Sequence, residues 1–209
     1  MIVITAAHCL HGKKIEDLSV RSGSSYWNHG GQSVNITKSV SHAKYNYSSF
    51  THDIAVLLLS SPLKFDNFTR NVELAESTPK AGTPALLSGW GIKYFGPSAK
   101  GPDKLQALTV FVKDRKKCKK AYNLLAELLA EEHYDIPEDN ICASSSDKGA
   151  CKGDSGGPLV TLLPTKLIGI VSSGFRCLTP SLYTDVTFFK TWIERTVKSF
   201  ACSPLKDYQ

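Results

Sequence analysis

Short apolar runs, interrupted by Gly, Pro and Ser, occupy most of the chain, and this pattern is typical of β-strands joined by turns. The clearest predicted strands lie at 1–5, 54–59, 105–112, 167–172 and 181–186. The run at 54–59 has no polar interruption, so we expect a strand that is buried on both faces. The pattern therefore predicts an all-β fold.

Two stretches depart from the β pattern. The stretch near 119–132 is rich in helix formers and carries an apolar stripe, so we expect an inserted surface helix. The stretch at 188–200 places Phe189, Trp192 and Ile193 on one helical face, which predicts a C-terminal helix docked on the body of the protein.

Composition and charge limit the classes of partner. The chain has 209 residues and is 42% hydrophobic, which is enough for a sizeable core in one or two domains. A net charge of +6 is too small to indicate nucleic-acid binding, and the basic run at 113–120 fits a solvated face better than a site for an anionic surface. No apolar run approaches membrane-spanning length. We expect neither nucleic acid nor a membrane as a partner.

A glycine-rich segment, Gly153-Asp154-Ser155-Gly156-Gly157, carries the first candidate chemistry. Glycines on both sides of the serine allow a tight turn that leaves its hydroxyl exposed. The backbone N–H groups of Gly153 and Ser155 can then converge on one point, as an oxyanion requires. Because a serine hydroxyl is a weak nucleophile, the chain must also supply a base and a group that orients the base.

Two further motifs supply these groups. His8 follows the apolar start of the chain, and Asp53 stands at the head of the 54–59 run. Taken singly, each residue has a simpler explanation: a turn serine, a core histidine and a strand-capping carboxylate. An esterase-type elbow would also fit the serine motif, but its histidine follows the serine, and all six histidines here precede Ser155.

With His8, Asp53 and Ser155 in this order, the chain resembles the chymotrypsin-like serine proteases. The run Ser88-Gly89-Trp90-Gly91 is a further match. The resemblance implies two antiparallel Greek-key β-barrels, the first one incomplete because the family's opening strands precede this point. It divides one peptidase domain into a first barrel with its crossing segment, 1–78, and a second barrel with the C-terminal helix, 79–209.

The resemblance also assigns roles. His8, Asp53 and Ser155 correspond to the catalytic triad, the amides of Gly153 and Ser155 to the oxyanion hole, and Ser172 and Asp154 to supporting residues. Together these roles imply a serine endopeptidase that acts through an acyl-enzyme intermediate. The substrate pocket would have Gly149 at its base and be completed by Ala150, Lys152, Ser173, Gly174 and Ser181.

The expected pocket lacks an acid at its base, which favours apolar or aromatic substrate residues over basic ones. Ser173 stands where the family usually has a tryptophan, and the loop at 177–180 is unusually short. These departures favour a second interpretation, a non-catalytic protease-like binding protein. The intact triad argues against it.

In the family, a freed N-terminus forms an ion pair with the aspartate before the serine, here Asp154. No activation sequence precedes Met1, so we expect the chain as written to be a fragment, or to have a misplaced start, and to turn over substrate weakly.

The six cysteines show no zinc-type spacing and fit disulfides in an oxidising compartment. The resemblance implies the pairs Cys118–Cys142 and Cys151–Cys177, and leaves Cys9 and Cys202 without an assigned partner. Three glycosylation sequons begin at Asn35, Asn46 and Asn67.

The expected product is a secreted monomer that acts on protein or peptide substrates and meets protease inhibitors. No cofactor is implied. No metal is expected either, because the segment between Arg21 and Val40, where many relatives bind calcium, has no Asp or Glu.

Overall fold

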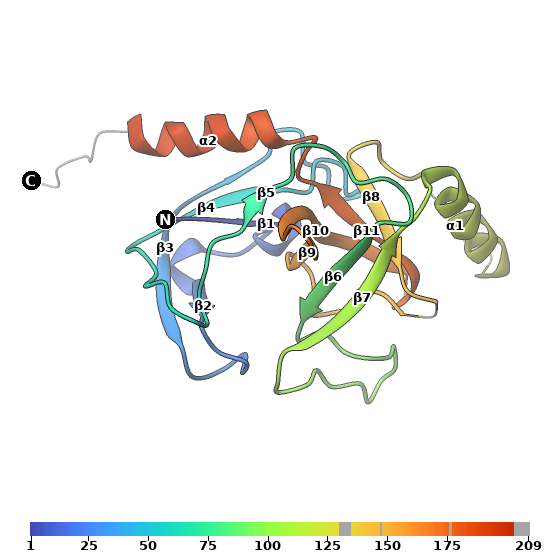
Figure 1. Ribbon diagram of the computed structural model, residues 1–209, viewed down its shortest axis with the longest axis horizontal. Helices are drawn as coiled ribbons and strands as arrows, with labels where there is room; N and C mark the ends of the chain where they lie inside the picture. Colours follow the sequence, from blue (N-terminus) through green and yellow to red (C-terminus); the bar gives the residue numbers. More distant parts are fainter. Residues whose placement is uncertain (130–134, 147, 176, 203–209) are drawn as a thin grey trace, which may run out of the picture.

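The computed structural model describes residues 1–129, 135–146, 148–175 and 177–202. Within these residues the protein is mostly β, with two sheets and two α-helices (Figure 1).

The first sheet is an antiparallel half-barrel of four strands in the order β1-β4-β3-β2. β4 is buried along almost its whole length, as its uninterrupted apolar sequence predicts. Two short 3-10 helices, η1 and η2, lie between β1 and β2. The elements are β1 (Ile2–Thr5), η1 (Ala7–Cys9), η2 (Ile15–Asp17), β2 (Ser19–Ser22), β3 (Gln32–Ser41) and β4 (Ala55–Leu59).

The second sheet has the order β11-β8-β7-β6-β9-β10, and pairing of β10 with β11 closes these six strands into a barrel. β5 (Glu73–Leu74), from the segment expected to cross between barrels, adds to β10 as a short parallel strand. The six barrel strands are β6 (Pro84–Gly89), β7 (Gln106–Val112), β8 (Asn140–Ser144), β9 (Pro158–Thr161), β10 (Lys166–Phe175) and β11 (Leu178–Asp185).

One hydrophobic cluster joins the two sheets. It combines Val56 of β4 and Ile54, just before β4, with Ile170 of β10 and Ile193 of α2. All four side chains are at most 3% exposed. Burial of these side chains holds the sheets together. The loops that carry His8 and Asp53 therefore lie where the two sheets meet.

The helices differ from the prediction mainly at their ends. α1 (Arg115–Leu129) begins earlier than expected, because Asp114 caps it by accepting the Lys117 N–H at 3.0 Å. Its predicted end, 130–132, lies outside the described residues. α2 (Lys190–Cys202) packs against β4, and α1 lies beside β8 and β11 at the far end of the second barrel (Figure 1). No helix in the described ranges has the length and apolarity needed to cross a bilayer.

Candidate active site

His8 and Asp53 form a two-point contact. Asp53 Oδ2 lies 2.7 Å from His8 Nδ1, and Asp53 Oδ1 accepts the His8 backbone N–H at 2.8 Å. η1 presents the histidine and the turn before β4 presents the aspartate. Because Nδ1 faces the carboxylate, it carries the proton in the neutral ring, and Nε2 is left as the basic nitrogen.

The second sheet supplies further partners for Asp53, which is 0% exposed. Ser172 Oγ donates to Asp53 Oδ2 at 2.7 Å, and Thr184 Oγ1 donates to the Asp53 carbonyl at 2.8 Å. Each carboxylate oxygen therefore accepts at least one hydrogen bond, which compensates for burying the charge.

Two opposing influences act on the pKa of His8. Burial lowers it, but the hydrogen bond and negative charge of Asp53, together with the adjacent Cys9, outweigh burial and raise the pKa well above its ordinary value. The ring nitrogen Nε2 lies 3.6 Å from Cys9 Sγ. Cys9 therefore contacts the nitrogen that would accept a proton during catalysis.

Ser155 lies on an exposed turn that packs against the His8 segment. Thr5 Oγ1 donates to the Gly156 carbonyl at 3.5 Å, and a Cβ added to Gly156 would lie 3.0 Å from Cys9 Sγ. Glycine at position 156 thus permits the close approach of the two segments. Among the described residues, Ser155 Oγ has no hydrogen-bond partner, and His8 Nε2 contacts Cys9 instead.

The N–H groups of Gly153 and Ser155, which are the predicted oxyanion-hole donors, donate no hydrogen bond to any other described residue. The neighbouring Asp154 carboxylate accepts the Gly91 N–H at 2.8 Å and the Cys151 N–H at 3.0 Å. No described cation lies within ion-pair distance of Asp154. The Met1 carbonyl accepts the Leu59 N–H of β4 at 3.1 Å.

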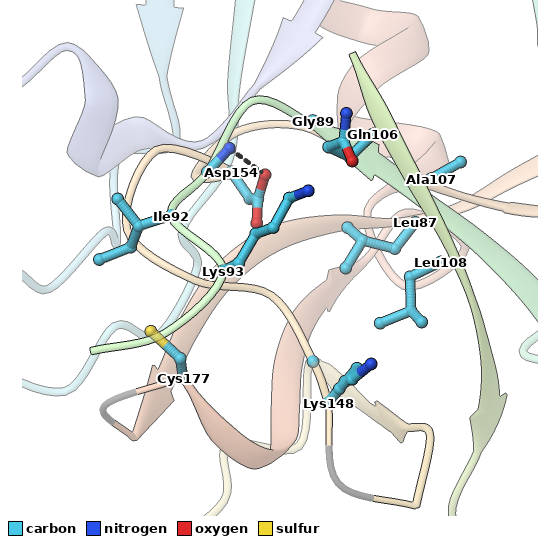
Figure 2. Close-up of a pocket in the computed structure, with 12 residues that line it drawn as sticks. Leu87, Gly89, Ile92, Lys93, Gln106, Ala107, Leu108, Lys148, Asp154 and Cys177 are labelled. Carbon is cyan, nitrogen blue, oxygen red and sulfur yellow. Dashed lines mark hydrogen bonds between the residues drawn. The ribbon is translucent and has the colours of Figure 1, made fainter. Parts of the chain in front are cut away.

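Asp154 also lines a cavity of about 380 Å³. Gly149, Lys93, Lys148 and Cys177 are among the other residues around it. Figure 2 shows Asp154 and Lys93 on the same side of this cavity. Of the six residues predicted for the substrate pocket, only Gly149 is among its lining residues.

The other predicted pocket residues divide into two groups. Ser181 Oγ accepts the Ala150 N–H at 2.9 Å, both residues are buried, and Gly174 pairs with Ser181 across β10 and β11. A side chain at Gly149 would collide with the Ser181 hydroxyl, so these four residues adjoin one another. Lys152 is exposed and Ser173 is half-buried.

Two disulfides fasten the second barrel. Cys118–Cys142 ties α1 to β8, and Cys151–Cys177 ties the segment before Ser155 to the β10–β11 connection. Cys9 forms no disulfide with any described residue, and the side chain of Cys202 lies outside the description. The sequon residues Asn35, Asn46 and Asn67 are all exposed.

Sequence reasoning missed two features near the site. Cys9 touches His8 Nε2, a contact for which adjacency in the chain was the only available signal. Asp139 binds the main chain just before Asp53, from a position 87 residues away, and no motif marks it. Within the described ranges, no group of three His, Cys, Asp or Glu residues could hold a metal ion.

Comparison with known proteins adds independent findings. A family profile described as "Trypsin" matches residues 1–193. Trypsin beta of Drosophila erecta is 38% identical over 196 residues, covering 92% of this chain and 73% of that protein. Trypsin of Sarcophaga bullata is 36% identical, covering 94% and 75%. Among solved structures, neuropsin, a serine protease expressed in the limbic system of mouse brain, matches with a TM-score of 0.80 and 33% identity, over 94% of this chain and 84% of that one.

Proposed function

The chain belongs to the trypsin family and is a serine endopeptidase, and we propose that its catalytic triad is His8, Asp53 and Ser155. The observation that supports this most strongly is the bond of 2.7 Å between His8 Nδ1 and Asp53 Oδ2. It leaves Nε2 as the base beside the turn that bears Ser155. The test is hydrolysis of a peptide substrate by the wild type and by Ser155→Ala. The proposal predicts that the variant loses this activity.

In the proposed reaction, Ser155 Oγ attacks the carbonyl carbon of a peptide bond while His8 Nε2 takes the hydroxyl proton. Asp53 keeps the ring oriented and stabilises the imidazolium. His8 then gives the proton to the departing amine, which leaves an acyl-enzyme on Ser155. Water then attacks this ester while His8 Nε2 takes its proton. His8 returns that proton to Ser155 Oγ as the acid product leaves.

The developing oxyanion needs donors, and the free N–H groups of Gly153 and Ser155 are the candidates. Their position depends on Asp154, which lies between them in the chain. In the described residues, only backbone amides hold its carboxylate. We therefore expect weak turnover from residues 1–209 as they stand.

Adding a small ammonium compound tests this expectation. An Ile-Val dipeptide offers a free ammonium that can enter the cavity beside Asp154, and it should raise peptide turnover by about tenfold, or ~1.4 kcal/mol of barrier. N-acetyl-Ile-Val, which lacks the charge, should have no effect, and Asp154→Asn should abolish the response. High turnover without dipeptide would contradict the expectation while leaving the triad intact.

For the substrate pocket, we favour neutral side chains. Gly149 brings no charge, Ala150 is apolar, and the Ser181 hydroxyl already accepts the Ala150 N–H. A basic substrate side chain would find no carboxylate among the six proposed pocket residues. Hydrolysis of matched peptides with Phe, Leu or Arg before the scissile bond is the test, and a clear Arg preference contradicts the proposal.

Trypsin-family proteases act on protein or peptide substrates, and we propose that this chain acts outside the cell as a monomer. Two disulfides fit an oxidising compartment, and the exposed Asn35, Asn46 and Asn67 are open to glycosylation. Protease inhibitors that present a substrate-like loop are the expected further partners. Two measurements test the location: whether expressing cells release the protein into the medium, and whether the mass of the released protein decreases on glycosidase treatment.

A further inference from the structure

Asp139 belongs to the second barrel, but its carboxylate binds the main chain of the first half. Its Oδ2 accepts the His52 backbone N–H at 2.6 Å, and its Oδ1 accepts Asn140 Nδ2 at 3.0 Å. The residue is 3% exposed and lies directly before β8. A buried carboxylate that accepts an N–H forms a charge-assisted bond, which is stronger than a neutral one.

The backbone that Asp139 holds is unusual. His52 has a φ of 54°, in the left-handed region that a histidine rarely adopts. The Ile54 N–H bonds back to the His52 carbonyl at 2.9 Å, so the chain turns tightly around Asp53. Such a conformation persists only where its surroundings stabilise it.

A second group of the same barrel holds the other side of this turn. The buried Thr184 donates to the Asp53 carbonyl, and the Asp139 carbonyl accepts the Asp185 N–H at 2.8 Å. Asp139, directly before β8, and Thr184, in β11, therefore bond to the main chain on the two sides of Asp53. The direction of the Asp53 carboxylate depends on these bonds.

The imidazole of His52 is the weaker partner of Asp139. Its Nδ1 lies 3.6 Å from Asp139 Oδ2, beyond hydrogen-bond distance, and its ring packs 4.8 Å from His42 and 5.5 Å from Phe189. The main-chain bond is shorter by 1.0 Å (3.6 less 2.6 Å). The carboxylate therefore acts on the backbone, and the ring packs beside it.

We infer that Asp139 is a positioning residue: it holds His52 in its left-handed conformation and so aims Asp53 at His8. The inference rests on the proposed function, because it assigns Asp139 a role in orienting the proposed triad. Asp139 touches none of the three triad side chains and takes no part in the chemistry itself.

Three variants separate this role from a loss of folding. Asp139→Ala removes the acceptor, and kcat should fall by about tenfold, ~1.4 kcal/mol of barrier, with KM within about twofold. Asp139→Asn keeps an oxygen that can accept the His52 N–H and should recover most of kcat. Asp135→Ala removes an exposed acid paired with Lys119 and should match the wild type. Active-site titration corrects each kcat for folded, competent enzyme.

A second readout needs no turnover. Because Asp53 raises the pKa of His8, loosening Asp53 should lower that pKa in Asp139→Ala, as measured by NMR titration of the ring. A simple loss of folded protein would reduce the signal without moving its midpoint. A lowered pKa in a chain without peptidase activity would support the positioning role while the proposed function fails. Unchanged kcat and unchanged pKa in Asp139→Ala would overturn the inference.

Discussion

The two sides of the candidate active site are held in different ways. On the base side, Asp53 is fully buried and bonded to His8, Ser172 and Thr184. On the nucleophile side, Ser155 is exposed, its hydroxyl is unbonded within the described residues, and the N–H groups of Gly153 and Ser155 donate to no described residue. The polar groups of the base side are bonded to one another, whereas the hydroxyl of Ser155 and the N–H groups of Gly153 and Ser155 have no partner among the described residues.

This difference follows from where each side draws its contacts. The base side is formed where the two sheets share a core, so packing and hydrogen bonds fix it together. The Ser155 turn is held mainly by its backbone: the Gly156 N–H donates to the Val171 carbonyl of β10 and the Val171 N–H donates to the Gly157 carbonyl, each at 2.9 Å. The Asp154 carboxylate adds bonds from the Gly91 and Cys151 N–H groups.

Removing the nucleophile should have the largest effect. Ser155→Ala leaves the base side intact but deletes the attacking oxygen, so kcat should fall by about a millionfold, to below detection. The matched control is Ser60→Ala, an exposed serine at the end of β4, which should leave hydrolysis unchanged. Turnover that persists in Ser155→Ala would assign the chemistry to another group.

The second largest loss of activity is expected when the contact between Asp53 and His8 is disrupted. Asp53→Asn keeps the shape but presents an amide to His8 Nδ1, which favours the wrong imidazole tautomer, and kcat should fall by about 10⁴-fold. Steady-state kinetics on a peptide substrate measures the loss. A change smaller than tenfold would mean that the bonded side of the site does not limit catalysis.

A single supporting bond should matter less. Ser172→Ala removes one of the donors to the Asp53 carboxylate, so kcat should fall by about tenfold. Ser144→Ala removes a hydroxyl from another buried serine, on β8, and serves as the control. Equal losses in the two variants would indicate general destabilisation.

The sequence located much of this arrangement. The pattern predicted individual strands, because alternation and apolar runs report local burial, whereas their arrangement into two barrels was implied by the family resemblance. The motifs marked His8, Asp53 and Ser155 as candidates. The hydrogen bond from the His52 backbone N–H to Asp139 could not be predicted from the sequence. It joins residues 87 apart, and because its donor is a backbone group, no sequence motif marks it. The start of α1 was predicted too late in the chain. Its capping residue, Asp114, lies inside the basic run at 113–120, which was interpreted as a solvated surface rather than as the start of a helix.

The smallest predicted effect concerns Cys9. This thiol helps to raise the pKa of His8, so Cys9→Ala should lower that pKa. His8 must be neutral to accept the serine proton, and a lower pKa keeps it neutral at lower pH. The acid limb of the kcat/KM profile should therefore move to lower pH, with a plateau within about twofold of the wild type. A shift to higher pH would contradict the contact at Nε2.

Covalent labelling tests the central claim most directly, that the base side formed by His8 and Asp53 activates Ser155. We predict that a fluorophosphonate probe, given with Ile-Val dipeptide, modifies Ser155 as located by peptide mass spectrometry. We predict that the label is lost in His8→Ala. Failure to label the folded chain, labelling at another residue, or equal labelling of His8→Ala would contradict the account.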